Sequence, residues 1–96
     1  MKATVIDAKD NVAVLLGEVK KGDSITFTKG GQAFEVKAGG DIPPFHKIAN
    51  TPIAKGDFVV KYGEHIGIAA EDIPAGAHVH VHNVLNSREN LHKEAK

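Results

Sequence analysis

Histidine is the residue type with the clearest chemical potential in this chain. Six are present, and three of them alternate with valine in the segment His78-Val79-His80-Val81-His82. Side chains two residues apart share one face of a β-strand, so we expect these three imidazoles to point one way and the two valines into the core. Imidazoles about 7 Å apart at Cα can converge on one metal ion at about 2.1 Å. His80 and His82 are therefore candidate metal ligands.

Such a pair needs further ligands, and the candidates outside this segment are His46 and His65. Their distance from the segment cannot be deduced from the sequence. The alternative interpretation is an exposed strand edge that carries three ordinary polar side chains.

Two turns carry the other reactive groups. His46 and Lys47 follow Pro43-Pro44, and the prolines restrict the backbone before them. The segment Lys61-Tyr62-Gly63-Glu64 combines a cation, a phenol and a carboxylate. Lysine attracts a carboxylate, while histidine, tyrosine and glutamate exchange protons or bind hydroxyl groups, so the combination suits a polyhydroxy acid. Each group taken alone also fits an ordinary solvated turn.

The elements that must position these groups are strands. Apolar and polar residues alternate with a period of two, which predicts strands with one buried face at residues 4–6, 24–28, 32–36 and 78–82. Gly30-Gly31 lies between the second and third of these runs and predicts a β-hairpin there, because tight hairpin turns need positive φ.

A weak repeat runs through the chain: Val or Ile, two residues, Gly, two residues, then Val or Ile. It occurs at 19–25, 53–59 and 73–79, and a fourth copy at 42–48 has Phe45 in place of the glycine. The repeated glycine indicates shared turn chemistry rather than shared function. Four turn-and-strand units in so short a chain predict a compact, barrel-like sheet.

Size and composition restrict the function further. Ninety-six residues fit one domain, and the 12 basic and 12 acidic residues provide no net charge to attract nucleic acid or an anionic membrane. There is no cysteine, and no apolar run suits a signal peptide or a membrane span, so we expect an unprocessed cytoplasmic protein. Residues 1–84 are expected to form the domain, and residues 85–96 a tail that is a short helix or disordered. No motif completes an enzyme, so the chain is not expected to be active alone.

Three motifs in order resemble one known family. They are His46-Lys47-Ile48-Ala49, the segment from Asp57 to Gly67, and Asp72-Ile73-Pro74-Ala75-Gly76 followed by His80-Val81-His82-Asn83. Together with Asp10–Val14, they are similar to the N-terminal region of altronate and galactarate dehydratases. The small subunit of sulfolactate sulfo-lyase is also similar. The resemblance extends from about Asp10 to Asn83.

This resemblance implies an all-β SAF domain of the β-clip fold, a small irregular β structure. Family members are lyases that eliminate water, or sulfite in the sulfo-lyase, usually with a divalent metal such as ferrous iron. Most of the catalytic apparatus is then expected in a large partner, and the chain reads as a separate small subunit or as a cut N-terminal domain. The matched positions imply the following roles: His46 and His82 catalytic, Lys47, Lys61, Tyr62 and Asn83 substrate-binding, and His80 and His82 metal-binding.

Two positions depart from the family. Phe45 stands where relatives usually have glycine before the His-Lys pair. Glycine there suggests positive φ or the close approach of a partner, and phenylalanine would be strained by the first and would obstruct the second. His78 stands where relatives carry another polar residue, so it is the least dependable candidate of the three.

The leading hypothesis is thus a small subunit or N-terminal domain of a sugar-acid hydro-lyase that helps to close the active site of a larger partner. Two alternatives stay open. One is the small subunit of a sulfolactate sulfo-lyase. The other is a non-catalytic SAF module that binds a ligand or forms a homo-oligomer through a strand edge.

Overall fold

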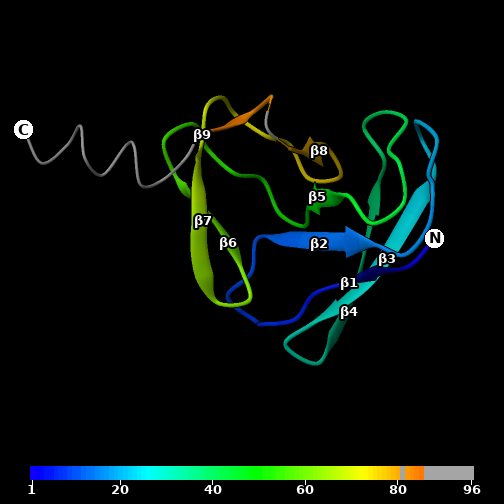
Figure 1. The fold of residues 1–96 in the computed structure, drawn as a ribbon. Helices are drawn as coiled ribbons and strands as arrows, with labels where there is room; N and C mark the ends of the chain where they lie inside the picture. Colours follow the sequence, from blue (N-terminus) through cyan, green and yellow to red (C-terminus); the bar gives the residue numbers. More distant parts are fainter. Residues whose placement is uncertain (81, 86–96) are drawn as a thin grey trace, which may run out of the picture.

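The computed structural model describes residues 1–80 and 82–85, and this part of the chain is built from strands alone (Figure 1). The all-β prediction is confirmed. The tail expected from residue 85 onward lies outside the described residues, apart from Leu85 itself. The strands are β1 (Ala3–Thr4), β2 (Val12–Leu15), β3 (Ser24–Lys29), β4 (Gln32–Lys37), β5 (Lys47–Ala49), β6 (Phe58–Lys61), β7 (Glu64–Ala69), β8 (His78–Val79) and β9 (Val84–Leu85).

The strands form three small antiparallel sheets. Their orders are β1-β2-β5-β8, β3-β4 and β6-β7-β9. Figure 1 shows the β6–β7 hairpin on one side of β2 and the β3–β4 hairpin on the other. In the described ranges the sheets do not close into a barrel, so the architecture is irregular rather than barrel-like.

The predicted hairpin is present. Strands β3 and β4 pair along six residues each and end at the Lys29–Gln32 pair, with Gly30 and Gly31 between them at φ 59° and 79°. Two consecutive positive φ angles are the geometry of a type I′ turn, which matches the twist of the flanking strands. The alternation and the glycine pair thus predicted the two strands and their turn. The buried face expected of residues 32–36 is wrong, because every residue of β4 is exposed except the half-buried Val36.

The repeated glycines occupy one recurring turn. Gly22, Gly56 and Gly76 have φ angles of 88°, 90° and 88°. The N–H of each donates to the carbonyl of an alanine in another segment, and the N–H of that alanine donates to the residue after the glycine. The three alanines are Ala38, Ala69 and Ala49. Shared turn chemistry, as predicted, explains the repeat.

Phe45 occupies the same turn in the fourth copy. Its φ is 67°, its N–H donates to the Leu15 carbonyl at 3.0 Å, and the Leu15 N–H donates to the His46 carbonyl at 2.9 Å. Of the two reasons considered for a glycine in relatives, positive φ therefore applies here, and it costs a residue with a Cβ about 1–2 kcal/mol. This turn fixes the backbone that carries His46.

Two hydrophobic clusters lie on opposite faces of the β2–β5 pair. Ala13, Leu15 and Ile48 belong to one cluster, whereas Val12 and Ala49 belong to the other. Successive residues of a strand point to opposite faces, so two short strands contribute to both cores. Because β5 is buried on both faces, its backbone is held in place, and so is the strand β8 that pairs with it.

Candidate histidine site

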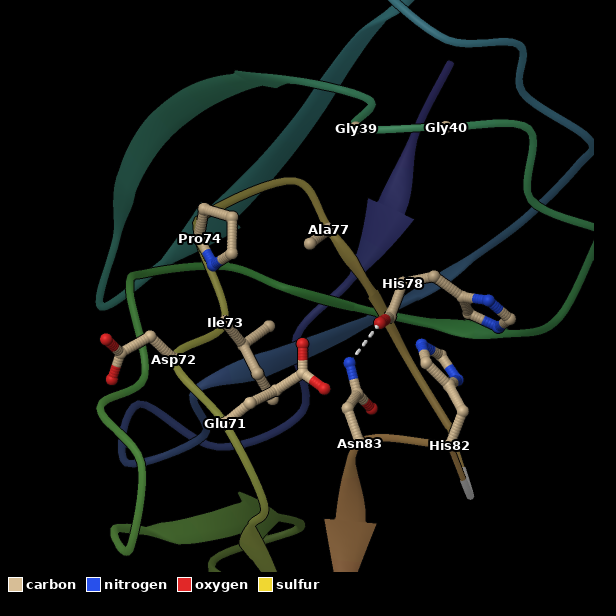
Figure 2. A pocket seen from close by; sticks show the side chains of 10 residues that line it. All are labelled: Gly39, Gly40, Glu71, Asp72, Ile73, Pro74, Ala77, His78, His82 and Asn83. Atoms are coloured by element: carbon tan, nitrogen blue, oxygen red, sulfur yellow. Dashed lines mark hydrogen bonds between the residues drawn. The ribbon is translucent and has the colours of Figure 1, made fainter.

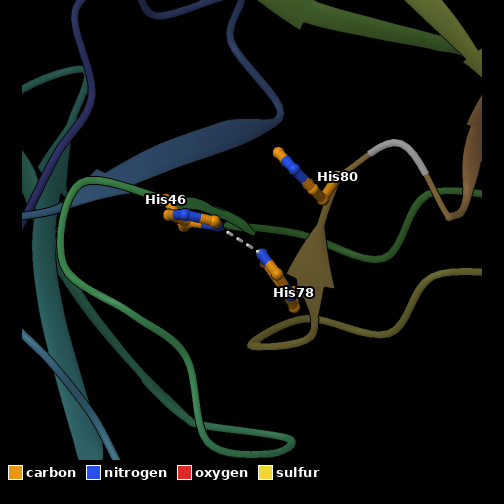
Figure 3. A group of neighbouring side chains, drawn as sticks. All are labelled: His46, His78 and His80. Carbon is orange, nitrogen blue, oxygen red and sulfur yellow. Dashed lines mark hydrogen bonds between the residues drawn. The ribbon is translucent and has the colours of Figure 1, made fainter.

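Three histidines meet at the edge of the four-stranded sheet (Figure 3). One ring nitrogen of each of His46, His78 and His80 lies within 4.8 Å of the others. The Nδ1 atom of His46 is 2.9 Å from Nε2 of His78. The His46 ring centroid is 4.9 Å from that of His80, and the nearly parallel rings of His78 and His80 are 5.4 Å apart. We call these three residues the histidine group.

The pairing of β5 with β8 explains why His46 lies beside His78 and His80. Ile48 lies opposite His78 in this antiparallel pair. Continuing the register by two residues puts His46 opposite His80, on the same face as His78. The histidine group therefore combines residues 32 positions apart in sequence, a proximity that the sequence alone does not show.

The predicted strand over residues 78–82 is too long. Only His78 and Val79 form β8; a bend follows at His80 and a turn at His82 and Asn83, while Val81 lies outside the described residues. Val79 is fully buried, as predicted. The turn brings the His82 ring back to 5.3 Å from that of His78, but His82 is not part of the histidine group.

Asn83 holds this turn. Its Oδ1 accepts the His80 N–H at 3.0 Å and its Nδ2 donates to the His78 carbonyl at 2.8 Å. The residue is buried, and both polar atoms bond to the main chain on either side of Val79. Asn83 thus positions His78 and His80. Its expected contact with substrate stays a prediction.

Burial and neighbouring rings control the protonation of His78. Burial lowers its pKa first, and the positive charges that His46, His82, His80 and Lys47 can carry lower it further. The short contact with His46 also needs one N–H and one lone pair, so at least one of the two nitrogens is unprotonated. Both effects favour the neutral imidazole, which is the form that binds a metal or accepts a proton.

The two lysines predicted to bind substrate belong to neighbouring segments: Lys47 is in β5 and Lys61 is in β6. Lys47 is half-buried, and burial followed by the charge of Lys61 lowers its pKa. The Lys61 Nζ lies 4.7 Å from the ring centroid of Tyr62, which has a φ of 56° in the β6–β7 turn. The charge of Lys61 thus acts on Lys47, and the charge of Lys47 acts on His78. Substrate binding by Lys47, Lys61 and Tyr62 stays a prediction.

A cavity of about 200 Å³ lies beside the histidine group (Figure 2). His78, His82 and Asn83 line one side, and Glu71 and Asp72 come from the segment before the Ile73 turn. The remaining lining residues are Gly39, Gly40, Ile73, Pro74 and Ala77. Glu71 and Asp72 were not singled out from the sequence, because nothing in their local pattern shows that this segment lies beside His78 and His82.

His65 does not belong to the histidine group. Its ring stacks on Phe58, with centroids 4.0 Å apart and an interplanar angle of 13°. It belongs to the β6–β7 hairpin and is not a member of the histidine group. Of the two additional ligands considered from the sequence, only His46 reaches the group.

Asp10 is a structural residue of this region whose role the sequence analysis missed. Its Oδ1 accepts the Gly63 N–H at 2.8 Å and its Oδ2 accepts the Asp7 N–H at 3.2 Å. Burial alone would raise its pKa, but the backbone N–H groups of Gly63, Asp7, Tyr62 and Ile6 together hold the pKa below its usual value. A charged Asp10 therefore fixes the turn that presents Lys61 and Tyr62.

The fold and the histidine group define an all-β domain with an imidazole site at a sheet edge. The family described as the altronate/galactarate dehydratase SAF domain matches residues 1–87. The chain belongs to this family. The fold expected from the resemblance and the family assignment are thus both confirmed.

Individual relatives are of two kinds. The chain is 41% identical over 91 residues to an altronate dehydratase of Escherichia coli, covering 95% of this chain and 18% of that protein. It is 44% identical over 78 residues to an altronate dehydratase of Bacillus subtilis, covering 81% of this chain and 15% of that protein. It is also 40% identical over 89 residues to the (2R)-sulfolactate sulfo-lyase subunit alpha of Chromohalobacter salexigens, covering 88% of this chain and 93% of that one.

The chain thus spans less than a fifth of the altronate dehydratases but nearly all of the sulfo-lyase subunit. Within the described residues there is no helix long and apolar enough to cross a membrane.

Proposed function

We propose that this chain is the small component of a sugar-acid hydro-lyase and that its histidine group helps to form an active site with a larger catalytic partner. The observation that carries the proposal is the histidine group itself, which lies at a sheet edge beside a cavity of only about 200 Å³. Substrate pockets usually measure about 300–1,000 Å³, so a second protein surface is needed to enclose a sugar acid.

The elimination requires a base and an acid. A base removes the proton from the carbon next to the carboxylate, the carbon–oxygen bond to the neighbouring hydroxyl breaks, and that oxygen leaves as water after receiving a proton. The imidazoles of His46 and His82 suit these two transfers, because an imidazole can both accept and donate a proton. Lys47 and Lys61 suit the substrate carboxylate, because the charge of Lys47 acts on His78 and that of Lys61 acts on Lys47.

The histidine group also fits a divalent metal, including the ferrous iron that the family implies. Nitrogens at a four-coordinate metal are roughly 3.4 Å apart for bonds of about 2.1 Å, so nitrogens within 4.8 Å need only small side-chain rotations. Imidazole is a suitable ligand for iron and zinc. His46, His78 and His80 would hold the metal, in place of the pair His80 and His82 expected from the sequence. With a metal bound, His46 would act as a ligand instead of transferring a proton. A metal bound there would supply a Lewis acid for a substrate oxygen.

The test is co-expression of this chain with the large lyase chain from the same organism. We infer that the protein works in the cytoplasm, so cytoplasmic expression is used. The assay measures water elimination from altronate and galactarate with ferrous iron. Co-purification with turnover, and loss of turnover in His46→Ala, are the expected results. A small chain that purifies alone and leaves the turnover of the large chain unchanged would favour a binding module and reject the proposal.

The second candidate is a sulfolactate sulfo-lyase component. The similarity to the C. salexigens subunit alpha favours it, because the 40% identity extends over 93% of that subunit. The same two-chain preparation would then release sulfite from sulfolactate and leave altronate unchanged. Sulfite release without dehydration would select this candidate.

A further inference from the structure

Phe45 is the most exposed large hydrophobic residue in the described part of the chain, with 73% of its surface accessible. It also has a φ of 67°, in a turn whose three other copies use glycine at this position. The backbone hydrogen bonds of the turn involve only main-chain atoms, so they do not require a phenyl ring. The side chain therefore adds conformational strain and exposed apolar surface to the isolated domain without contributing to its core.

Two other exposed apolar residues lie at the same end of β2. Leu16 directly follows Leu15, the residue that pairs with Phe45, and Leu16 is 53% exposed. Met1 is 46% exposed, and its side chain lies over Gly17. We call Met1, Leu16 and Phe45 the apolar rim. Since His46 follows Phe45, the rim directly adjoins the histidine group.

We propose that the apolar rim is the docking surface for the large catalytic chain, with Phe45 inserted into an apolar pocket of that chain. The inference rests on the proposed function. A protein that completes the histidine group must approach the edge on which His46 lies, and Phe45 is beside it. The altronate dehydratases supply a further argument, because more than four fifths of their length lies outside the segment that this chain matches.

Burial of one aromatic anchor in a partner pocket commonly dominates the affinity of an interface. The partner surface is thus specified as an apolar pocket that lies beside the histidine group when the two chains are bound.

The experiment measures the affinity of the purified large lyase chain from the same organism for three forms of this chain. These are the wild type, Phe45→Gly, and the control Ile66→Ala, which removes an exposed apolar side chain from β7. Phe45→Gly is expected to raise the Kd at least tenfold and also to raise the urea midpoint of the free domain, because it relieves strain. Ile66→Ala is expected to change the Kd less than twofold.

The outcomes separate the two proposals. Wild-type binding with an unchanged Kd in Phe45→Gly would overturn the docking surface and leave the proposed function standing. Failure of the wild type to bind the large chain would overturn both. A wild-type dimer that Phe45→Gly dissociates would assign the rim to a second copy, and a raised KM with an unchanged Kd would assign Phe45 to the substrate. Either of the last two results would also overturn the docking surface.

Discussion

The His78 ring lies next to the rings of three other histidines. From the residue pattern it is the least dependable candidate of the three alternating histidines, because relatives carry another polar residue there. In the structure it contacts His46 at 2.9 Å, stacks against His80 and lies 5.3 Å from His82. The difference comes from the β5–β8 register, which places His78 opposite Ile48 and within reach of His46.

This position gives a prediction for metal binding by the isolated domain. His78→Ala should weaken Co²⁺ binding by at least tenfold, because one of three ligands is lost. His82→Ala should change the affinity less than threefold, because His82 lies outside the histidine group. The visible absorption of Co²⁺ during a titration measures both. A larger loss in His82→Ala than in His78→Ala would restore the ligand pair expected from the sequence.

Asp10 gives a pH-dependent prediction at the same scale. Its folded-state pKa is lower than the ordinary value of 3.8, so its contribution to stability is present above that value and is lost as the pH falls through the folded pKa. Asp10→Asn should reduce the free energy of unfolding at neutral pH by about 2 kcal/mol, because the buried carboxylate accepts charge-assisted hydrogen bonds.

Urea denaturation at neutral pH and in acid below the folded pKa measures this effect. The deficit of Asp10→Asn should shrink in acid, where the wild type is also uncharged. Asp57→Asn, at an exposed carboxylate, serves as the control. A deficit of equal size at both pH values would show that the charge of Asp10 does not stabilise the turn.

At the scale of elements, the turns were predictable and the short strand at the site was not. Gly30-Gly31 and the alternation around them define the β3–β4 hairpin locally, and the repeated glycines define three equivalent turns. The alternation at 78–82 predicts a strand equally well. There, however, the Asn83 side chain accepts the His80 N–H and competes with further strand pairing.

Asn83→Ala tests that competition. The substitution removes both side-chain bonds and leaves two partly buried backbone groups without these partners, so it should cost about 1 kcal/mol of stability. It should also weaken Co²⁺ binding, because His78 and His80 lose their fixed separation. Denaturant unfolding and the same absorption titration provide the two readouts. Unchanged metal affinity in a destabilised variant would limit Asn83 to a structural role outside the histidine group.

The recurring turns supply a matched pair of substitutions. A Cβ on Gly56 meets no atom within 4 Å, so Gly56→Ala should cost only the left-handed conformation, about 1–2 kcal/mol. A Cβ on Gly76 would collide with the Lys37 carbonyl oxygen, so Gly76→Ala should destabilise the domain considerably more. Thermal unfolding measures both. Equal losses would show that the backbone around Gly76 moves easily.

At the scale of the whole molecule, the all-β class and the family were accessible from the sequence, whereas the arrangement of three sheets around two cores was not. Residues such as Val12 and Ala13 are both apolar neighbours in one strand, and the sequence does not show that they enter different clusters. The histidine group depends on the same long-range pairing. The resemblance identified His46, while only the fold joined it to His78 and His80.

The catalytic contribution of the histidine group is tested by the rate of sugar-acid dehydration by a fixed amount of the large lyase chain as this chain is added. We expect the rate to rise and then to saturate at equal amounts of the two chains. His46→Ala should bind with the same saturation point but produce little increase. A rate that does not depend on this chain, or full stimulation by His46→Ala, would contradict a catalytic contribution from the histidine group.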